Sequence, residues 1–181
     1  MTAERKSALL IVDAQVGVLA SVAEAGGIVR TIEALVRRAR ASDVPVIWVQ
    51  HADHELQYGS DAWKLAPGLV PAPAEPIVHK QFNSSFAATE LERHLRDLGV
   101  SRIVLAGAAT SWCIRATAYA ALDRGYSLGI VSDAHSTEPV PLTDGSTVPA
   151  ASIIAEFNTV MRWISYPDVT VDVDTAAQIA L

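Results

Sequence analysis

Short apolar runs alternate with segments of helical periodicity along this 181-residue chain, and this alternation constrains the fold more than any other feature. The apolar runs lie at 8–13, 44–50, 76–80, 102–107, 126–133 and 168–173, and the helical patterns lie at 28–42, 88–99, 110–124 and 152–163. Strands that alternate with helices form parallel sheets covered on both faces. We therefore expect one domain over residues 1–181, with a three-layer α/β/α, doubly wound, six-stranded and mainly parallel sheet.

Composition limits the kinds of partner and the cellular compartment that are expected for this chain. The chain is 50% hydrophobic with a net charge of −6, and its lysines and arginines form no basic stripe, so a small-molecule partner is expected rather than nucleic acid. No apolar stretch approaches the roughly 18 to 20 residues that span a bilayer, and residues 1–15 lack a cleavage pattern. The single cysteine, Cys113, excludes an internal disulfide. These features predict a cytoplasmic protein without membrane association.

Chemically capable side chains occur at the ends of three predicted strands. Asp13 ends the first strand, Lys80 ends the third, and Cys113 follows the fourth. Parallel strands place their carboxyl ends at one edge of the sheet, where such folds bind ligands. Two long connections, 51–75 and 134–149, begin at the same edge. A carboxylate base, an ammonium and a thiol nucleophile at this edge form a coherent catalytic set.

Cys113 lies at the beginning of a predicted helix, after the small-residue turn GAATS. Backbone N–H groups at a helix N-terminus stabilise a thiolate, and a nearby lysine adds to this effect. Backbone donors around Ala109 and Cys113 would form an oxyanion hole, and Thr110 and Ser111 would cap the helix. The alternative is structural: lone cysteines are commonly small buried hydrophobes, aspartates cap turns and lysines are solvated.

Four blocks resemble the isochorismatase-like cysteine hydrolases, a family of isochorismatases, nicotinamidases, carbamoylsarcosine amidases and ureidoacrylate amidohydrolases. The blocks are LLIVDAQ (9–15), KQFNSSFAATELERHLRDLGV (80–100), VLAGAATSWCIRATAYAALDRGY (104–126) and VSDAH (131–135). The resemblance implies a catalytic triad of Asp13, Lys80 and Cys113, a thioester intermediate and no cofactor. It also implies a non-proline cis peptide between Ala108 and Ala109, and a homodimer or homotetramer. Residues 175–181 would contribute to the interface between subunits; the alternative is that this terminus frays.

The sequence departs from the nicotinamidases at their metal motif. The Asp-x-His of those enzymes corresponds to Gln50 and Ala52, so no metal is predicted, although His51, Asp53 and His54 lie close together. Val18 replaces a phenylalanine of many relatives, which would widen the pocket. The candidate substrate-binding residues, each with a structural alternative, are Gln15, Val18, Trp63, Phe82, Trp112 and His135.

Three functions remain open at this point. The leading hypothesis is a cysteine hydrolase that cleaves a C–N bond of a small amide, carbamoyl or ureido compound. The second is an isochorismatase-type vinyl ether hydrolase, which depends chiefly on the acidic residue, Asp13. The third is a small-molecule binding domain that has lost turnover. The substrate itself is not specified, because it depends on loop conformations.

Overall fold

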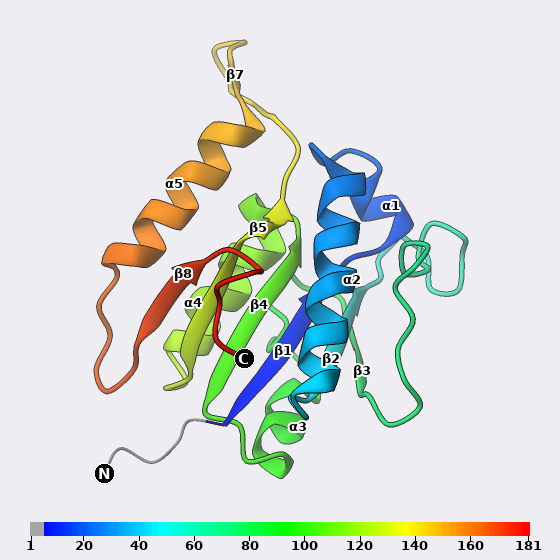
Figure 1. Cartoon of the computed structure of the whole chain (residues 1–181). Helices are drawn as coiled ribbons and strands as arrows, with labels where there is room; N and C mark the ends of the chain where they lie inside the picture. Colours follow the sequence, from blue (N-terminus) through cyan, green and yellow to red (C-terminus); the bar gives the residue numbers. More distant parts are fainter. Residues whose placement is uncertain (1–5) are drawn as a thin grey trace.

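All six strands of the main sheet are parallel and run in the order β3-β2-β1-β4-β5-β8 in the computed structural model, which describes residues 6–181 (Figure 1). The strands are β1 (Ser7–Val12), β2 (Val46–His51), β3 (Ile77–Lys80), β4 (Arg102–Ala108), β5 (Ser127–Ser136) and β8 (Val171–Asp174). Both central strands, β1 and β4, are buried along their whole length, as their uninterrupted apolar sequences require. The predicted fold class is confirmed.

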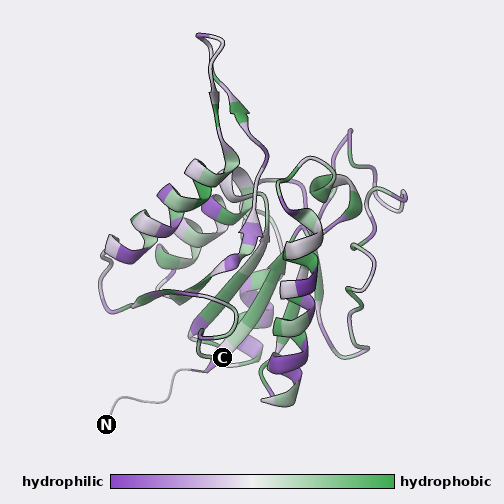
Figure 2. Ribbon diagram, turned by 45° about the horizontal axis from the view of Figure 1, so that its top comes forward, coloured by the Kyte–Doolittle hydropathy of each residue, from purple (hydrophilic) through white to green (hydrophobic). Residues whose placement is uncertain are grey.

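Helices cover both faces of the sheet (Figure 1). On one face lies α2 (Ala25–Ala41), whose buried Ile32 belongs to the same apolar cluster as Leu9 of β1 and Val104 of β4. The opposite face carries α3 (Leu91–Asp97), α4 (Arg115–Leu122) and α5 (Ala150–Trp163). Successive residues of a strand point to opposite faces, so each buried strand feeds both apolar layers. Figure 2 shows the strands mainly hydrophobic and the helices mixed. Among residues 6–181, no helix has both the length and the apolar character to cross a membrane.

Gly107 allows the two central strands to approach closely at their carboxyl ends. It pairs with Val12 and has a φ of +129°. A Cβ built on Gly107 would lie 1.9 Å from the carbonyl oxygen of Val12, far inside the contact distance of any real side chain. Only glycine fits this position. The residue that follows Val12 is Asp13, so the close approach occurs directly beside Asp13.

The connection after β5 differs from the expected loop. β5 continues to Ser136, past the predicted end at residue 133, so His135 lies on a strand and not in a loop. The remaining connection carries a short hairpin of β6 (Val140–Pro141) and β7 (Thr147–Val148), which projects from the body of the protein in Figure 1. A four-residue helix, α1 (Val16–Leu19), follows β1 and was not predicted.

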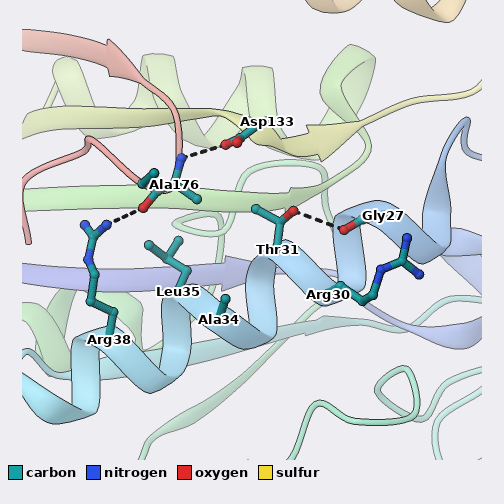
Figure 3. Close-up of a pocket in the computed structure, with 9 residues that line it drawn as sticks. Gly27, Arg30, Thr31, Ala34, Leu35, Arg38, Asp133 and Ala176 are labelled. Atoms are coloured by element: carbon teal, nitrogen blue, oxygen red, sulfur yellow. Dashed lines mark hydrogen bonds between the residues drawn. The ribbon is translucent and has the colours of Figure 1, made fainter.

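The C-terminal segment is fastened to α2 and to the sheet (Figure 3). Arg38 donates to the carbonyl oxygens of Ala176 and Ile179, and Asp133 accepts a 2.7 Å hydrogen bond from the N–H of Ala176. A hollow of about 610 Å³ lies between this segment and α2. Ile179 is buried, which contradicts the alternative that this terminus frays.

Candidate active site

The three chemically capable side chains meet at the carboxyl edge of the sheet. Lys80, the last residue of β3, places its Nζ 2.6 Å from Oδ2 of Asp13 and 3.3 Å from Sγ of Cys113. The side chains of Lys80 and Asp13 are 0% and 1% exposed, and Cys113 is partly buried. The ammonium therefore lies in contact with both the carboxylate and the thiol.

The backbone around Asp13 directs its side chain into this cluster. Asp13 adopts the left-handed conformation, with a φ of 49°, directly after β1. Aspartate tolerates this region better than most residues, and such conformations concentrate at functional sites. Its N–H donates to the carbonyl oxygen of Val49 at 2.9 Å, which continues the β1–β2 ladder up to the site.

Cys113 lies in a π-helical turn, η1 (Thr110–Ile114), and not in the first turn of the expected α-helix. The N–H groups of Trp112 and Ile114 both donate to the carbonyl oxygen of Ala109 at 3.1 Å. The peptide bond that precedes Ala109 is cis, at the position that the sequence resemblance implied. Single π-helical turns occur frequently at functional sites. Ala109 and Cys113, the two predicted oxyanion-hole residues, thus belong to one tight turn.

Thr110 and Ser111 do not cap this turn, contrary to expectation. Their hydroxyl groups instead bond outward, Thr110 to Nδ1 of His135 and Ser111 to Oγ1 of Thr137, both at 2.9 Å. The partners belong to β5 and the residue that follows it, so the extended end of β5 holds the turn that carries Cys113.

Burial controls the protonation of the site. Desolvation raises the pKa of Asp13, although the charge of Lys80 opposes this shift. Desolvation together with the negative charge of Asp13 raises the pKa of Cys113 to about 12, again against the effect of Lys80. The expected stabilisation of a resting thiolate is therefore outweighed. The resting thiol keeps its proton, and the carboxylate beside it has a raised affinity for that proton.

An isochorismatase domain model matches residues 7–164. This chain belongs to the isochorismatase family. It is 35% identical over 155 residues to streptothricin hydrolase of Streptomyces noursei, which covers 80% of this chain and 60% of that protein. It is 25% identical over 173 residues to ureidoacrylate amidohydrolase of Methylobacterium radiotolerans, covering 77% of this chain and 64% of that protein. The chain thus spans less than two thirds of the length of these two relatives.

The solved structures agree with this assignment. An isochorismatase from Pseudomonas putida KT2440 superposes with a TM-score of 0.88 at 27% identity, over 97% of this chain and 90% of that chain. Together with the domain match, this similarity supports membership of the isochorismatase family, in which the two relatives above are named as a hydrolase and an amidohydrolase.

Two of the candidate substrate-binding residues of this family member are engaged inside the protein. Gln15 is fully buried, donates to the carbonyl oxygens of His51 and Trp63, and accepts from the N–H of His51. His135 is 1% exposed, with its second ring nitrogen 3.0 Å from Asn158, and burial lowers its pKa to about 4. All their polar side-chain atoms have protein partners, which favours structural roles.

The other four candidates lie at different places around the site. Val18 packs against the apolar layer that contains α2. Trp63 packs against Tyr58 with a ring-centroid distance of 4.4 Å and an interplanar angle of 47°. Its buried indole N–H has no partner within residues 6–181. Phe82 is 57% exposed and, with Tyr58, lines a hollow of about 450 Å³ that reaches Lys80. Trp112 is half exposed and donates to Glu138 at 2.7 Å.

Sequence reasoning weighed His51 only as part of a weak metal cluster and did not place it in contact with Lys80. Nδ1 of His51 lies 3.3 Å from Nζ of Lys80, and its Nε2 lies 3.0 Å from Asp53. His54 points elsewhere, toward Glu55, and within residues 6–181 no three histidine, cysteine or acidic side chains gather as metal ligands do. The pairing of neighbouring strands could have indicated this contact, because His51 at the end of β2 pairs with Lys80 at the end of β3.

Proposed function

We propose that this protein is a cysteine hydrolase that cleaves a C–N bond of a small amide, carbamoyl or ureido compound through a thioester on Cys113. One observation carries the proposal: a buried ammonium, that of Lys80, contacts both the carboxylate of Asp13 and the sulfur of Cys113. Nucleophile, base and charge-compensating group are thus in contact before substrate binds.

In the first half-reaction, the carboxylate of Asp13 takes the thiol proton as Cys113 Sγ attacks the substrate carbonyl carbon. The raised pKa of Asp13 brings this base closer to neutral pH, which improves proton transfer. Backbone N–H groups of Ala109 and Cys113 would hold the oxyanion. As the C–N bond breaks, Asp13 returns the proton to the departing nitrogen, and ammonia or an amine leaves.

In the second half-reaction, a water molecule attacks the thioester carbonyl and gives a proton to Asp13. The C–S bond breaks, the product leaves as a carboxylic or carbamic acid, and Cys113 recovers its proton from Asp13. Throughout both halves Lys80 stays charged and contacts whichever of the two partners is negative. The proton shuttles between Asp13 and the reacting atoms, so no external co-reactant besides water is needed.

The test is release of ammonia or amine from a panel of small amides, carbamoyl and ureido compounds that includes streptothricin and ureidoacrylate, the compounds in the names of two relatives. We expect Cys113→Ala and Asp13→Asn to abolish release, whereas Asp61→Asn, an exposed carboxylate in the 51–75 connection, should match wild type. Acid quench followed by intact mass should show the acyl group on Cys113. Release that survives in Cys113→Ala would contradict a cysteine nucleophile.

A second candidate, vinyl ether hydrolysis of isochorismate type, is favoured by the raised pKa of Asp13, because such a carboxyl group can also act as an acid. This candidate requires the acid and not the sulfur. It predicts that Asp13→Asn loses turnover of isochorismate and Cys113→Ala retains most of it. Equal loss in both variants would exclude it.

A further inference from the structure

The ammonium of Lys80 has more neighbours than the proposed chemistry needs. Its Nζ lies 2.6 Å from Asp13 and 3.3 Å from Cys113, donates to the carbonyl oxygen of Phe82 at 3.1 Å, and faces Nδ1 of His51 at 3.3 Å. An ammonium donates and never accepts, so Nδ1 of His51 must present its lone pair. Asp13 and Cys113 take part in the proposed chemistry and Phe82 contributes a backbone carbonyl. The contact with the imidazole of His51 has no role so far.

The other side of the His51 ring decides where its proton lies. Nε2 is 3.0 Å from Oδ2 of Asp53, and a carboxylate only accepts, so Nε2 carries the proton. Asp53 is itself held, because its Oδ1 accepts from the backbone N–H groups of Glu55 at 2.9 Å and Leu56 at 2.7 Å. The bond from Leu56, more than any other contact, lowers the pKa of Asp53 to about 2.

The backbone of His51 is fixed as firmly as its ring. Gln15 accepts from the N–H of His51 at 2.8 Å and donates to its carbonyl oxygen at 3.0 Å. Gln15 also donates to the carbonyl oxygen of Trp63 at 2.7 Å. The buried amide of Gln15 thus ties the end of β2 to the segment that follows Asp13 and fixes the backbone from which the imidazole extends.

We propose that His51 and Asp53 are positioning residues that hold the Lys80 ammonium between Asp13 and Cys113, with Asp53 fixing the neutral, Nε2-protonated tautomer of His51. This inference rests on the proposed function, in which Cys113 is the nucleophile. It assigns a role to two of the three residues that the sequence presented as a weak metal cluster. Both nitrogens of His51 are directed at protein partners, and His54 takes no part.

Asp53→Asn is the decisive substitution because it keeps the shape of the side chain. The backbone N–H groups of Glu55 and Leu56 retain the amide oxygen, so the new NH₂ group faces Nε2 of His51 as a donor. Nε2 must then accept, and the ring proton moves to Nδ1, where it opposes the ammonium of Lys80. Lys80 is expected to withdraw from Cys113.

The readout needs no substrate. Lys80 lowers the pKa of Cys113, so its withdrawal reduces the thiolate fraction, and a half-unit rise in that pKa slows alkylation about threefold. We expect Asp53→Asn and His51→Leu to slow iodoacetamide labelling of Cys113 at pH 8 by about threefold or more. His51→Gln, whose amide oxygen can accept from Lys80, should recover most of the rate. Asp61→Asn removes a charge from the same connection and should label as wild type does.

The tautomer is observed directly by ¹⁵N spectroscopy of the histidine rings, with His51→Gln identifying the His51 signals. We expect the Nε2–H form in wild type and the Nδ1–H form in Asp53→Asn. A wild-type Nδ1–H tautomer, or wild-type labelling rates in folded Asp53→Asn and His51→Leu, would overturn the inference. The proposed function can fail separately. If the wild type hydrolyses no substrate of the panel while Asp53→Asn and His51→Leu still label slowly, only the proposed function is contradicted, because labelling and tautomer are measured without turnover.

Discussion

The ion pair between Lys80 and Asp13 makes a quantitative prediction, because its two side chains are 0% and 1% exposed and water cannot replace either partner. At 2.6 Å, two unit charges attract by about 6 kcal/mol when the effective dielectric constant is about 20. Desolvation offsets much of this attraction, yet removing one partner strands the other and costs about 3–5 kcal/mol. We therefore expect Lys80→Met to lose about 3–5 kcal/mol of unfolding free energy at pH 8.

The loss should depend on pH with a definite sign. Burial already raises the folded-state pKa of Asp13 above its ordinary value of 3.8, and without Lys80 nothing of comparable strength opposes the shift. The folded state then binds the proton more tightly than the unfolded state, so stability is greatest at low pH and falls as pH rises toward the folded-state pKa. Lys80→Met should recover much of its stability at pH 4.5, where Asp13 can stay neutral.

Urea unfolding followed by tryptophan fluorescence at pH 4.5 and pH 8 is the assay. The double variant Asp13→Asn/Lys80→Met contains no stranded charge and should be clearly more stable at pH 8 than Lys80→Met alone. It should fall short of wild type by about 2 kcal/mol, because the carbonyl of Phe82 and Nδ1 of His51 both lose the donor that Lys80 supplied. Lys64→Met breaks an exposed pair and should cost less than about 1 kcal/mol. Equal losses in Lys80→Met and Lys64→Met at pH 8, or a loss in Lys80→Met that does not change with pH, would refute the reasoning.

Three further predictions concern the surroundings of this pair. Gly107→Ala should lose about 3 kcal/mol or more in urea unfolding, because its Cβ would meet the carbonyl oxygen of Val12; a wild-type midpoint would contradict this. Burial lowers the folded-state pKa of His135 from 6.5 to about 4. The resulting contribution to stability, about 3 kcal/mol, is present above pH 6.5 and is lost as pH falls toward 4. His135→Gln should therefore flatten the pH dependence of the unfolding free energy between pH 6.5 and pH 4. Alkylation of Cys113 should still accelerate between pH 8 and pH 10, and Asp13→Asn should speed it at pH 8 by removing a negative charge that raises the thiol pKa; a slower rate in Asp13→Asn would count against this electrostatic account.

The fold could be predicted from the sequence wherever one local pattern determined the structure. The uninterrupted apolar runs of β1 and β4 predicted buried parallel strands, and the alternation with helices predicted the layers. The end of β5 could not be predicted, because its polar residues resemble a loop. His135 is buried there by Thr110 and Asn158, which come from distant parts of the chain. Apolar periodicity also does not distinguish the π-helical turn at Cys113 from an α-helix.

The meeting of three side chains could be predicted from the sequence, but the place of His51 beside them and the protonation of the cluster could not. The strand-end rule placed Asp13, Lys80 and Cys113 at one edge, and the structure brings them into contact. Sequence reasoning then expected a stabilised thiolate, since it counted the favourable charge of Lys80 and the helix terminus. It could not count desolvation or the opposing charge of Asp13, which depend on burial and distance and raise the thiol pKa.

Charge balance within the cluster explains why a protonated thiol suits this arrangement. One buried ammonium compensates one negative charge, so a carboxylate and a thiolate together would leave an excess charge in a region that excludes water. Moving the proton from Cys113 to Asp13 exchanges the two negative sites and keeps the total charge constant. Lys80 contacts both of them, so in the proposed reaction it would stabilise the thiolate as it forms. The features that raise the resting pKa of Cys113 are therefore the same features that let Asp13 receive its proton without creating an uncompensated charge.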